Sequence, residues 1–319
     1  MDAMRSSPAA VQPVVKKPSA WRQIKRGWRL YVLIALPLTY LVLFKYVPMY
    51  GIVIAFKDFA ATDGILGSKW VGLAHFERFF HSYEFWRVLN NTLVLSVYTL
   101  AAGFPFPILL ALSLNYVRNR MFKNTVQMVS YAPYFISIVV MVGIILEMLD
   151  PRHGLINTII RALGFETVGF MNNPAYFKSI FVWSGIWQSV GFNCIIFMAA
   201  LASIDPTLHE AAVVDGATKL RRMWHIDLPG IMPVAVILLI LNTGTILDSG
   251  FEKVLLMQNP LNLRTSEVID SYVYKVAFVS QVVNYSYSTA IGLFKSVIGL
   301  VLLVTVNKLA QRTGQSSLW

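Results

Sequence analysis

Long apolar runs dominate the pattern of hydrophobic and polar positions along this chain. About 20 consecutive apolar residues suffice for a helix to cross the hydrocarbon core of a bilayer. Runs of that kind occupy six segments, at 30–44 with a continuation toward 56, 89–116, 126–149, 179–203, 231–250 and 286–306. The pattern predicts an all-α, polytopic integral membrane protein with six transmembrane helices and both termini on one side of the membrane.

Composition supports the membrane class. Of the 319 residues, 56% are hydrophobic and only 13% are charged, which is too little polar surface to cover a soluble globule of this size. The net charge of +11 indicates nucleic-acid binding only where the basic residues gather on one folded face. Here they flank the apolar runs instead, so we expect a lipid bilayer as the partner of these charges and no nucleic acid.

The distribution of Lys and Arg predicts the orientation of the helices. One set of alternating segments holds 15 of the 27 basic residues in about 78 positions, namely 1–29, 117–125, 204–230 and 307–319. The other set holds 11 in about 110 positions, namely 45–88, 150–178 and 251–287. Because Lys and Arg are enriched on the cytoplasmic side, both termini are predicted to be cytoplasmic. We divide the chain into a basic, partly disordered cytoplasmic tail, 1–29, and a single transmembrane domain, 30–319.

A polar and partly basic stretch, 205–230, separates the fourth and fifth apolar runs. Asp205 followed by Pro206 is typical of a helix start, and Thr207 and Glu210 have the spacing of a capping box. These signals predict a short helix that extends to about Val214.

The second half of the same stretch predicts another helix. Gly216 permits the backbone to turn, and helical spacing resumes near Lys219, before Pro229 and Pro233 mark the entry to the fifth run. The sequence therefore predicts two short cytoplasmic helices joined at a glycine. An amphipathic connector that lies on the lipid headgroups is the alternative interpretation.

The spacing within this stretch resembles the EAA loop of ABC-importer permease subunits. Glu210-Ala211-Ala212 is followed after three residues by Gly216, and after nine more by Ile226-x-Leu228-Pro229. Further segments resemble the carbohydrate-uptake (maltose-type, binding-protein-dependent) branch, at 44–59, 90–115, 250–260 and 266–278. The chain is most similar to six-span members that import oligosaccharides of acidic polysaccharides such as alginate or pectin. The resemblance implies the type I ABC-importer permease fold in a bacterial cytoplasmic (inner) membrane.

The resemblance also assigns roles within the EAA loop. It implies that Glu210 meets a basic group on an ATPase subunit, that Ala211 and Ala212 permit close helix approach, and that Gly216 makes the turn. Further positions complete the coupling motif, namely Asp215, Trp224, Ile226, Leu228 and Pro229. The family often has Phe where Trp224 stands, which keeps an aromatic side chain at this position.

An importer of this kind is an assembly of several chains. The resemblance implies a second permease subunit, as a rule a different chain, two ABC ATPase subunits, an extracytoplasmic substrate-binding protein and an oligosaccharide substrate. This chain has no G-x-x-x-x-G-K-[ST] phosphate loop, so ATP and Mg are expected on the ATPase subunits and no cofactor on this chain. Its five histidines are scattered and its cysteine is single, so we expect no metal site and a transport subunit rather than an enzyme.

Lys295 is an ionisable residue inside the last apolar run, where a charge is costly. It shares one helical face with Ser288, Gly292 and Gly299. Lys295 can attract a uronate carboxylate in a substrate path, or it can pair with an acid such as Asp248 or Glu147. Both interpretations can hold at different stages of a transport cycle.

Polar and aromatic residues of the fourth and fifth runs extend this candidate substrate path. Sugars are bound by hydroxyl hydrogen bonds and aromatic faces, but interhelical hydrogen bonds and interfacial aromatic residues produce the same composition. Gly244 and Gly250 can loosen the outer end of the fifth run, where acidic residues would line an opening. The candidates are Trp187, Gln188, Asn193, Asn242, Asp248, Glu252 and Lys295.

Three other classes of membrane protein have to be weighed. An ion-coupled secondary transporter of sugars commonly has repeated halves and a coupling-ion site near the midplane, and we find neither pattern in the sequence. An ABC permease for a non-carbohydrate solute keeps the EAA spacing and changes only the substrate. A scaffold without transport activity explains the spans but leaves the EAA spacing unexplained.

Overall fold

The computed structural model describes residues 27–248 and 250–312, and its contacts divide the chain into two compact units, 1–52 and 53–319. In the first unit, α2 (Trp28–Leu41) continues through a π-helical turn (Val42–Tyr46) into α3 (Val47–Met49) and a 3-10 turn (Tyr50–Phe56). The helical run of 29 residues, Trp28–Phe56, confirms that the first apolar run extends to 56. Most of the predicted basic tail, 1–26, lies outside the described residues.

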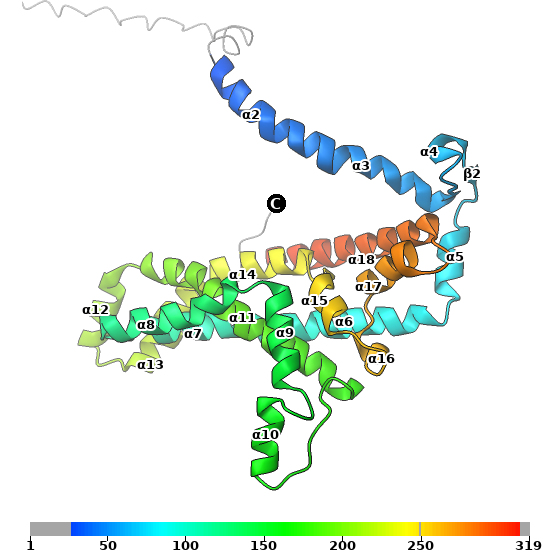
Figure 1. Ribbon diagram of the computed structural model, residues 1–319. Coiled ribbons are helices and arrows are strands. Elements are labelled where there is room, and N and C mark those ends of the chain that lie inside the picture. Colours follow the sequence, from blue (N-terminus) through cyan, green and yellow to red (C-terminus); the bar gives the residue numbers. More distant parts are fainter. Residues whose placement is uncertain (1–26, 249, 313–319) are drawn as a thin grey trace, which may run out of the picture. The chain divides into compact units, whose positions relative to one another are not determined.

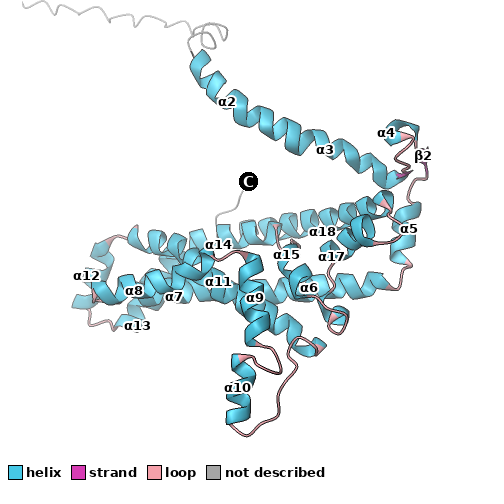
Figure 2. Cartoon of the chain, viewed as in Figure 1, coloured by secondary structure: helices cyan, strands magenta, loops and turns pink. Residues whose placement is uncertain are grey.

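The second unit is built almost entirely from helices (Figures 1 and 2). Its helices are α4 (Gly64–Gly67), α5 (Ala74–Phe80), α6 (Glu84–Gly103), α7 (Pro105–Asn115), α8 (Arg120–Tyr131), α9 (Ile138–Met148), α10 (Leu155–Ala162), α11 (Pro174–Ala202), α12 (Pro206–Val214), α13 (Lys219–Arg222), α14 (Leu228–Gly244), α15 (Phe251–Met257), α16 (Leu263–Ser266), α17 (Ile269–Tyr274) and α18 (Tyr285–Arg312). Strands β1 (Lys57–Asp58) and β2 (Lys69–Trp70) pair antiparallel, with Lys57 opposite Trp70. The all-α prediction is confirmed.

Five helical runs in the described part of the chain are long and apolar enough to cross a membrane, and a bent pair makes up a sixth. The bent pair joins Arg120–Phe135 to Ile138–Met148 at an angle of 101°, so the third span predicted over 126–149 is present as two helices with a sharp bend between them. The break follows from local sequence, because Pro133 lies in a 3-10 turn and Ser137 caps α9 by accepting the Val140 N–H. The Ile136 carbonyl at the break accepts a hydrogen bond of 2.9 Å from Gln188 Nε2 of α11.

The fifth run differs from the prediction at both ends. Its helix begins at Lys219, with a π-helical turn (Met223–Asp227) leading into α14, and it ends at Gly244 instead of 250. Pro229 sits in the first turn of α14, where a missing N–H costs little. The predicted second loop helix is therefore present as α13 and runs on into the span without a break. Beyond Gly244 the chain leaves the helix, and Gly250 adopts a positive φ of +62° before α15.

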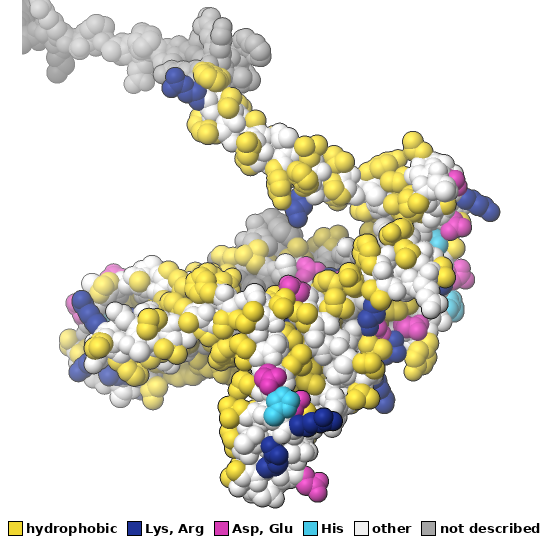
Figure 3. Space-filling model, viewed as in Figure 1, with side chains coloured by type: hydrophobic (Ala, Val, Ile, Leu, Met, Phe, Trp, Pro, Cys, Tyr) yellow, Lys and Arg dark blue, Asp and Glu magenta, His cyan; other side chains and the backbone are white. Residues whose placement is uncertain are grey.

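Helix α11 forms the centre of the second unit and packs against α6, α7, α8, α14 and α16. One buried cluster joins α11 to α6, α9 and α15, and a second, which contains Cys194, joins it to α7 and α14. Gly191 lets α8 approach closely, since a Cβ there would lie 2.1 Å from the Ser130 carbonyl oxygen. Hydrophobic side chains cover much of the visible surface of this unit (Figure 3).

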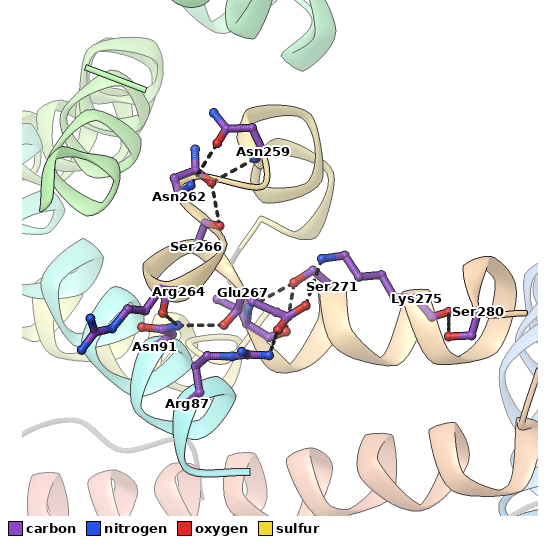
Figure 4. A network of polar contacts seen from close by, with 11 residues as sticks. Arg87, Asn91, Asn259, Asn262, Arg264, Ser266, Glu267, Ser271, Lys275 and Ser280 are labelled. Atoms are coloured by element: carbon purple, nitrogen blue, oxygen red, sulfur yellow. Dashed lines mark hydrogen bonds and ion pairs between the residues drawn. The ribbon is translucent and has the colours of Figure 1, made fainter. Parts of the chain in front are cut away.

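A polar network ties α6 to the segment that carries α16 and α17 (Figure 4). Glu267, only 3% exposed, contacts Arg87 at 2.5 Å and Lys275 at 2.9 Å. The Asn91 side chain donates to the carbonyl oxygens of Arg264 and Glu267 at 2.9 and 3.1 Å. Because the buried carboxylate has two cationic partners, this network is electrostatically compensated.

Candidate functional site

Helix α12 is built as its sequence predicts. It begins at Pro206 and ends at Val214, and the Asp205 side chain accepts the Thr207 N–H at 2.9 Å. This backbone hydrogen bond lowers the pKa of Asp205, because it favours the ionised carboxylate. The cap is therefore charged at neutral pH and stabilises the helix start.

Gly216 makes the predicted turn between α12 and α13. Its φ is +74°, a left-handed conformation that strains any other L residue, although a side chain there would meet nothing within 4 Å. The Ala217 N–H closes the end of α12 by donating to the Ala212 carbonyl at 2.8 Å. Glycine is therefore required here for its backbone conformation and not for lack of space around a side chain.

The loop with α12 and α13 exposes both charged and apolar side chains. Glu210, Ala211 and Asp215 are exposed. Ala212, Ile226 and Leu228 are half-buried, and Pro229 is exposed. Large exposed apolar side chains accompany these residues, namely Leu208, Val213, Val214, Leu220 and Trp224. Isolated apolar residues on a surface are ordinary, but a group of this size on two short helices and the turn that follows them is typical of a protein contact.

Asp227 links the loop to the rest of the second unit, a contact that the sequence did not reveal. Its side chain is fully buried, the Tyr116 hydroxyl donates to Oδ2 at 2.5 Å, and His209 Nε2 of α12 lies 3.2 Å from Oδ1. Burial, followed by the hydrogen bond to Asp227, raises the pKa of Tyr116. Tyr116 therefore remains a proton donor at neutral pH, and α12 is tied to the end of α7.

A cavity of about 490 Å³ lies among α6, α7, α9, α11, α14 and α15. Much of its wall is apolar, but hydroxyl, amide and charged side chains also line it. These are Ser96, Thr99, Gln188, Ser189, Asn193, Asn242, Thr245, Asp248 and Lys253. A mixed lining of this kind suits a hydroxyl-rich ligand, which needs hydrogen-bond partners as well as apolar surface.

Four of the seven candidate path residues meet at this cavity: Gln188, Asn193, Asn242 and Asp248. The other three do not line it. Trp187 is 51% exposed and borders a separate groove with Val126 and Val190. Glu252 is exposed in the first turn of α15.

Lys295, the third residue outside the cavity lining, is held by two carboxylates. Its Nζ lies 2.5 Å from Asp248 Oδ1 and 2.7 and 2.8 Å from the two oxygens of Asp270. The pair with Asp248 was one of the open alternatives, whereas Glu147 instead contacts His153 at 3.1 Å. Asp270 was missed because it lies on α17 outside every apolar run, so neither periodicity nor spacing relates it to Lys295.

Lys253 was also missed, because in the sequence it is one loop charge among several. It lies two residues into α15, is 6% exposed and lines the cavity. The signal that could have found it is its position three residues after Gly250, since a glycine turn beside a span end can fold the following residues back against the helices.

Six candidate spans, together with a cavity of mixed polar and apolar lining among helices of the second unit, define a polytopic membrane transport protein. The chain belongs to the family of binding-protein-dependent transport system inner membrane components, which it matches over residues 103–315. It is therefore a multi-span protein of the bacterial inner membrane. This membership does not favour the alternative of an ion-coupled secondary transporter.

Two relatives in Bacillus subtilis (strain 168) are similar over nearly the full chain. The polygalacturonan/rhamnogalacturonan transport system permease protein YteP is 46% identical over 290 residues, which are 91% of this chain and 90% of that protein. Protein LplB is 42% identical over 93% of this chain and 92% of its own length.

A solved structure gives the same fold. It is the bacterial alginate ABC transporter in complex with an alginate pentasaccharide-bound periplasmic protein, of which one chain is similar with a TM-score of 0.87 and 36% identity. The match covers 94% of this chain and all of that one. The expectation of an ABC-importer permease fold is confirmed.

Proposed function

We propose that this chain is the transmembrane permease subunit of an ATP-driven importer that takes up acidic oligosaccharides of the pectin or alginate type by alternating access. The observation that carries the proposal is the loop 205–230. Its Glu210-Ala211-Ala212 segment lies exposed on α12, and Gly216 joins that helix to α13 with a positive φ. An exposed helix with apolar side chains, braced by Asp227, can receive force from a separate subunit.

In this proposal the partners supply what the chain lacks. Two ABC ATPase subunits bind ATP and Mg and dock on α12, with Glu210 meeting a basic group. A second permease chain completes the pathway, and an extracytoplasmic binding protein delivers the sugar. The excess of Lys and Arg in the loop and in the segments facing the same side supports a cytoplasmic position for α12, α13 and both termini.

The substrate class is inferred from the cavity together with the relatives. The cavity offers amide, hydroxyl and charged groups within an apolar wall, as a charged sugar requires. A polygalacturonan/rhamnogalacturonan permease and an alginate transporter are among the similar proteins, and both polymers contain uronate residues. Acidic oligosaccharides are therefore the substrates to test first.

The test is uptake by the assembled importer in proteoliposomes that contain the binding protein. We expect the chain to co-purify with two ATPase subunits and to import oligogalacturonate or oligoalginate only when ATP is enclosed with the ATPase subunits. Uptake driven by a proton gradient without ATP would contradict the proposal. Import of neutral oligosaccharides alone would overturn the substrate class and leave the coupling mechanism intact.

A further inference from the structure

Two charged side chains line the cavity, and only one of them has an oppositely charged partner. Asp248 accepts a hydrogen bond from Lys295, so its charge is compensated. Lys253, by contrast, has no carboxylate oxygen within 4.0 Å of its Nζ among the residues that the structure describes. The neighbouring network differs, because there Arg87 and Lys275 share Glu267.

The Lys253 ammonium is held firmly against α11. Its Nζ donates to the Phe181 carbonyl oxygen at 2.7 Å and lies 4.6 Å from the centroid of the Phe181 ring. A Cβ at Gly185 would lie 3.2 Å from the same nitrogen, so the glycine leaves room for the charge. The side chain is thus held at the cavity wall by a hydrogen bond and a cation–π contact, and Gly185 leaves the space that its Nζ occupies.

A buried ammonium with these partners still lacks a counter-charge. The group carries three N–H donors, and the Phe181 carbonyl takes one of them. Burying a charge without an opposite charge is unfavourable, and burial accordingly lowers the pKa of Lys253 to about 7. A carboxylate that entered the cavity would supply the missing charge and a strong, charge-assisted acceptor, whereas a sugar hydroxyl would supply only a neutral acceptor.

We propose that Lys253 is the subsite that binds the carboxylate of an acidic sugar residue inside the cavity. The inference rests on the proposed function and deepens it, because it assigns acid selectivity within the membrane to one side chain. Asp248 also lines the cavity, but Lys295 compensates its charge, so Lys253 remains the site for an incoming carboxylate. The bound sugar therefore lies with its acidic group toward the Lys253 Nζ.

The experiment measures binding of two probes to the purified importer complex without its binding protein. The probes are trigalacturonate and its fully methyl-esterified form, which has the same rings but no charge. We expect the unmodified complex to bind the acid about tenfold or more tightly than the ester, the range of a charge-assisted hydrogen bond. Lys253→Met should remove this preference, and Lys253→Arg should retain it.

Lys57→Met is the matched control. Lys57 Nζ also donates to a backbone carbonyl, that of Ile65, at 2.7 Å, but it does not line the cavity. This variant should keep the preference for the acid. If Lys253 has a purely structural role, Lys253→Met should reduce the affinity for both probes equally. That result would overturn the inference.

Two further outcomes separate the inference from the proposed function. If the unmodified complex has no preference for the acid, or if the preference persists in Lys253→Met, the assignment of Lys253 is wrong. The proposed function survives in either case as long as ATP-dependent uptake of the acidic oligosaccharide is observed. Loss of that uptake in the unmodified importer would instead refute the function itself.

Discussion

The contact between Tyr116 and Asp227 offers a direct test of how the loop is fastened to the spans. Tyr116→Phe removes a single oxygen atom, the one that donates to Asp227 Oδ2 at 2.5 Å. The ring stays, so the packing of Arg222 over it, at 5.8 Å from the centroid, is preserved. The variant therefore isolates one hydrogen bond to a fully buried carboxylate.

The expected loss of stability follows from that burial. A hydrogen bond to a charged group contributes about 1.5–3 kcal/mol. His209 Nε2 remains 3.2 Å from the other carboxylate oxygen, without hydrogen-bond geometry, so Asp227 keeps a neighbouring imidazole. We expect a loss of about 2 kcal/mol, less than the roughly 3–5 kcal/mol of a buried charge left alone.

The assay combines thermal unfolding with ATPase activity. For a domain of roughly 150–250 residues, 1 kcal/mol shifts the midpoint by about 2–4 °C, so Tyr116→Phe should lower the Tm by about 4–8 °C. Because α12 is then less firmly tied to α7, ATPase activity stimulated by loaded binding protein should fall while basal ATPase activity is kept.

Tyr83→Phe is the control, since Tyr83 is 84% exposed and loses the same atom. It should leave both the Tm and the stimulation unchanged. If Tyr116→Phe behaves like Tyr83→Phe in both measurements, the Asp227 contact does not fasten the loop and the reasoning is refuted.

Three further variants probe the loop, the close helix contact and the ion cluster. Glu210→Lys should abolish substrate-stimulated ATPase activity and leave membrane insertion intact; normal stimulation would remove the role given to this carboxylate. Gly191→Ala should lower stability by about 2–3 kcal/mol, because its methyl group would overlap the backbone of α8, whereas Gly292→Ala, with nothing within 4 Å, should be tolerated in the same thermal assay. Lys295→Met should destabilise the complex by leaving two carboxylates without their cation, and adding Asp270→Asn should recover part of the Tm; a double variant no better than the single one would contradict the pairing.

The spans and the first loop helix could be predicted because their causes are local. A backbone in lipid has to satisfy its own hydrogen bonds, so a long apolar run has few alternatives to a helix. Helix α12 depends on a cap at Asp205 and a break at Gly216, both set by neighbours in the sequence. The 101° bend of the third span was missed although Pro133 and Ser137 lie at it, because hydropathy does not register backbone direction.

Only one charge contact of the site, between Lys295 and Asp248, was among the alternatives that the sequence offered. The other contacts could not be predicted, because their causes are distant in sequence. Lys295 pairs with Asp270 across 25 residues and with Asp248 across 47. Lys253 reaches the carbonyl of Phe181 across 72 residues. Such pairs depend on how helices pack, and a single sequence gives no distance between one helix and another.

The hydrogen bond between Gln188 and the Ile136 carbonyl has a consequence for how this protein is made. The acceptor precedes its donor by 52 residues, and a ribosome adds roughly 5–20 residues per second. The bend in the third span thus emerges roughly 3–10 s before the side chain that satisfies its backbone. During that interval the Ile136 carbonyl needs a hydrogen-bond donor from water or from another protein, since lipid offers none. The backbone of the third span is therefore fully hydrogen-bonded at its bend only after α11 has packed against it.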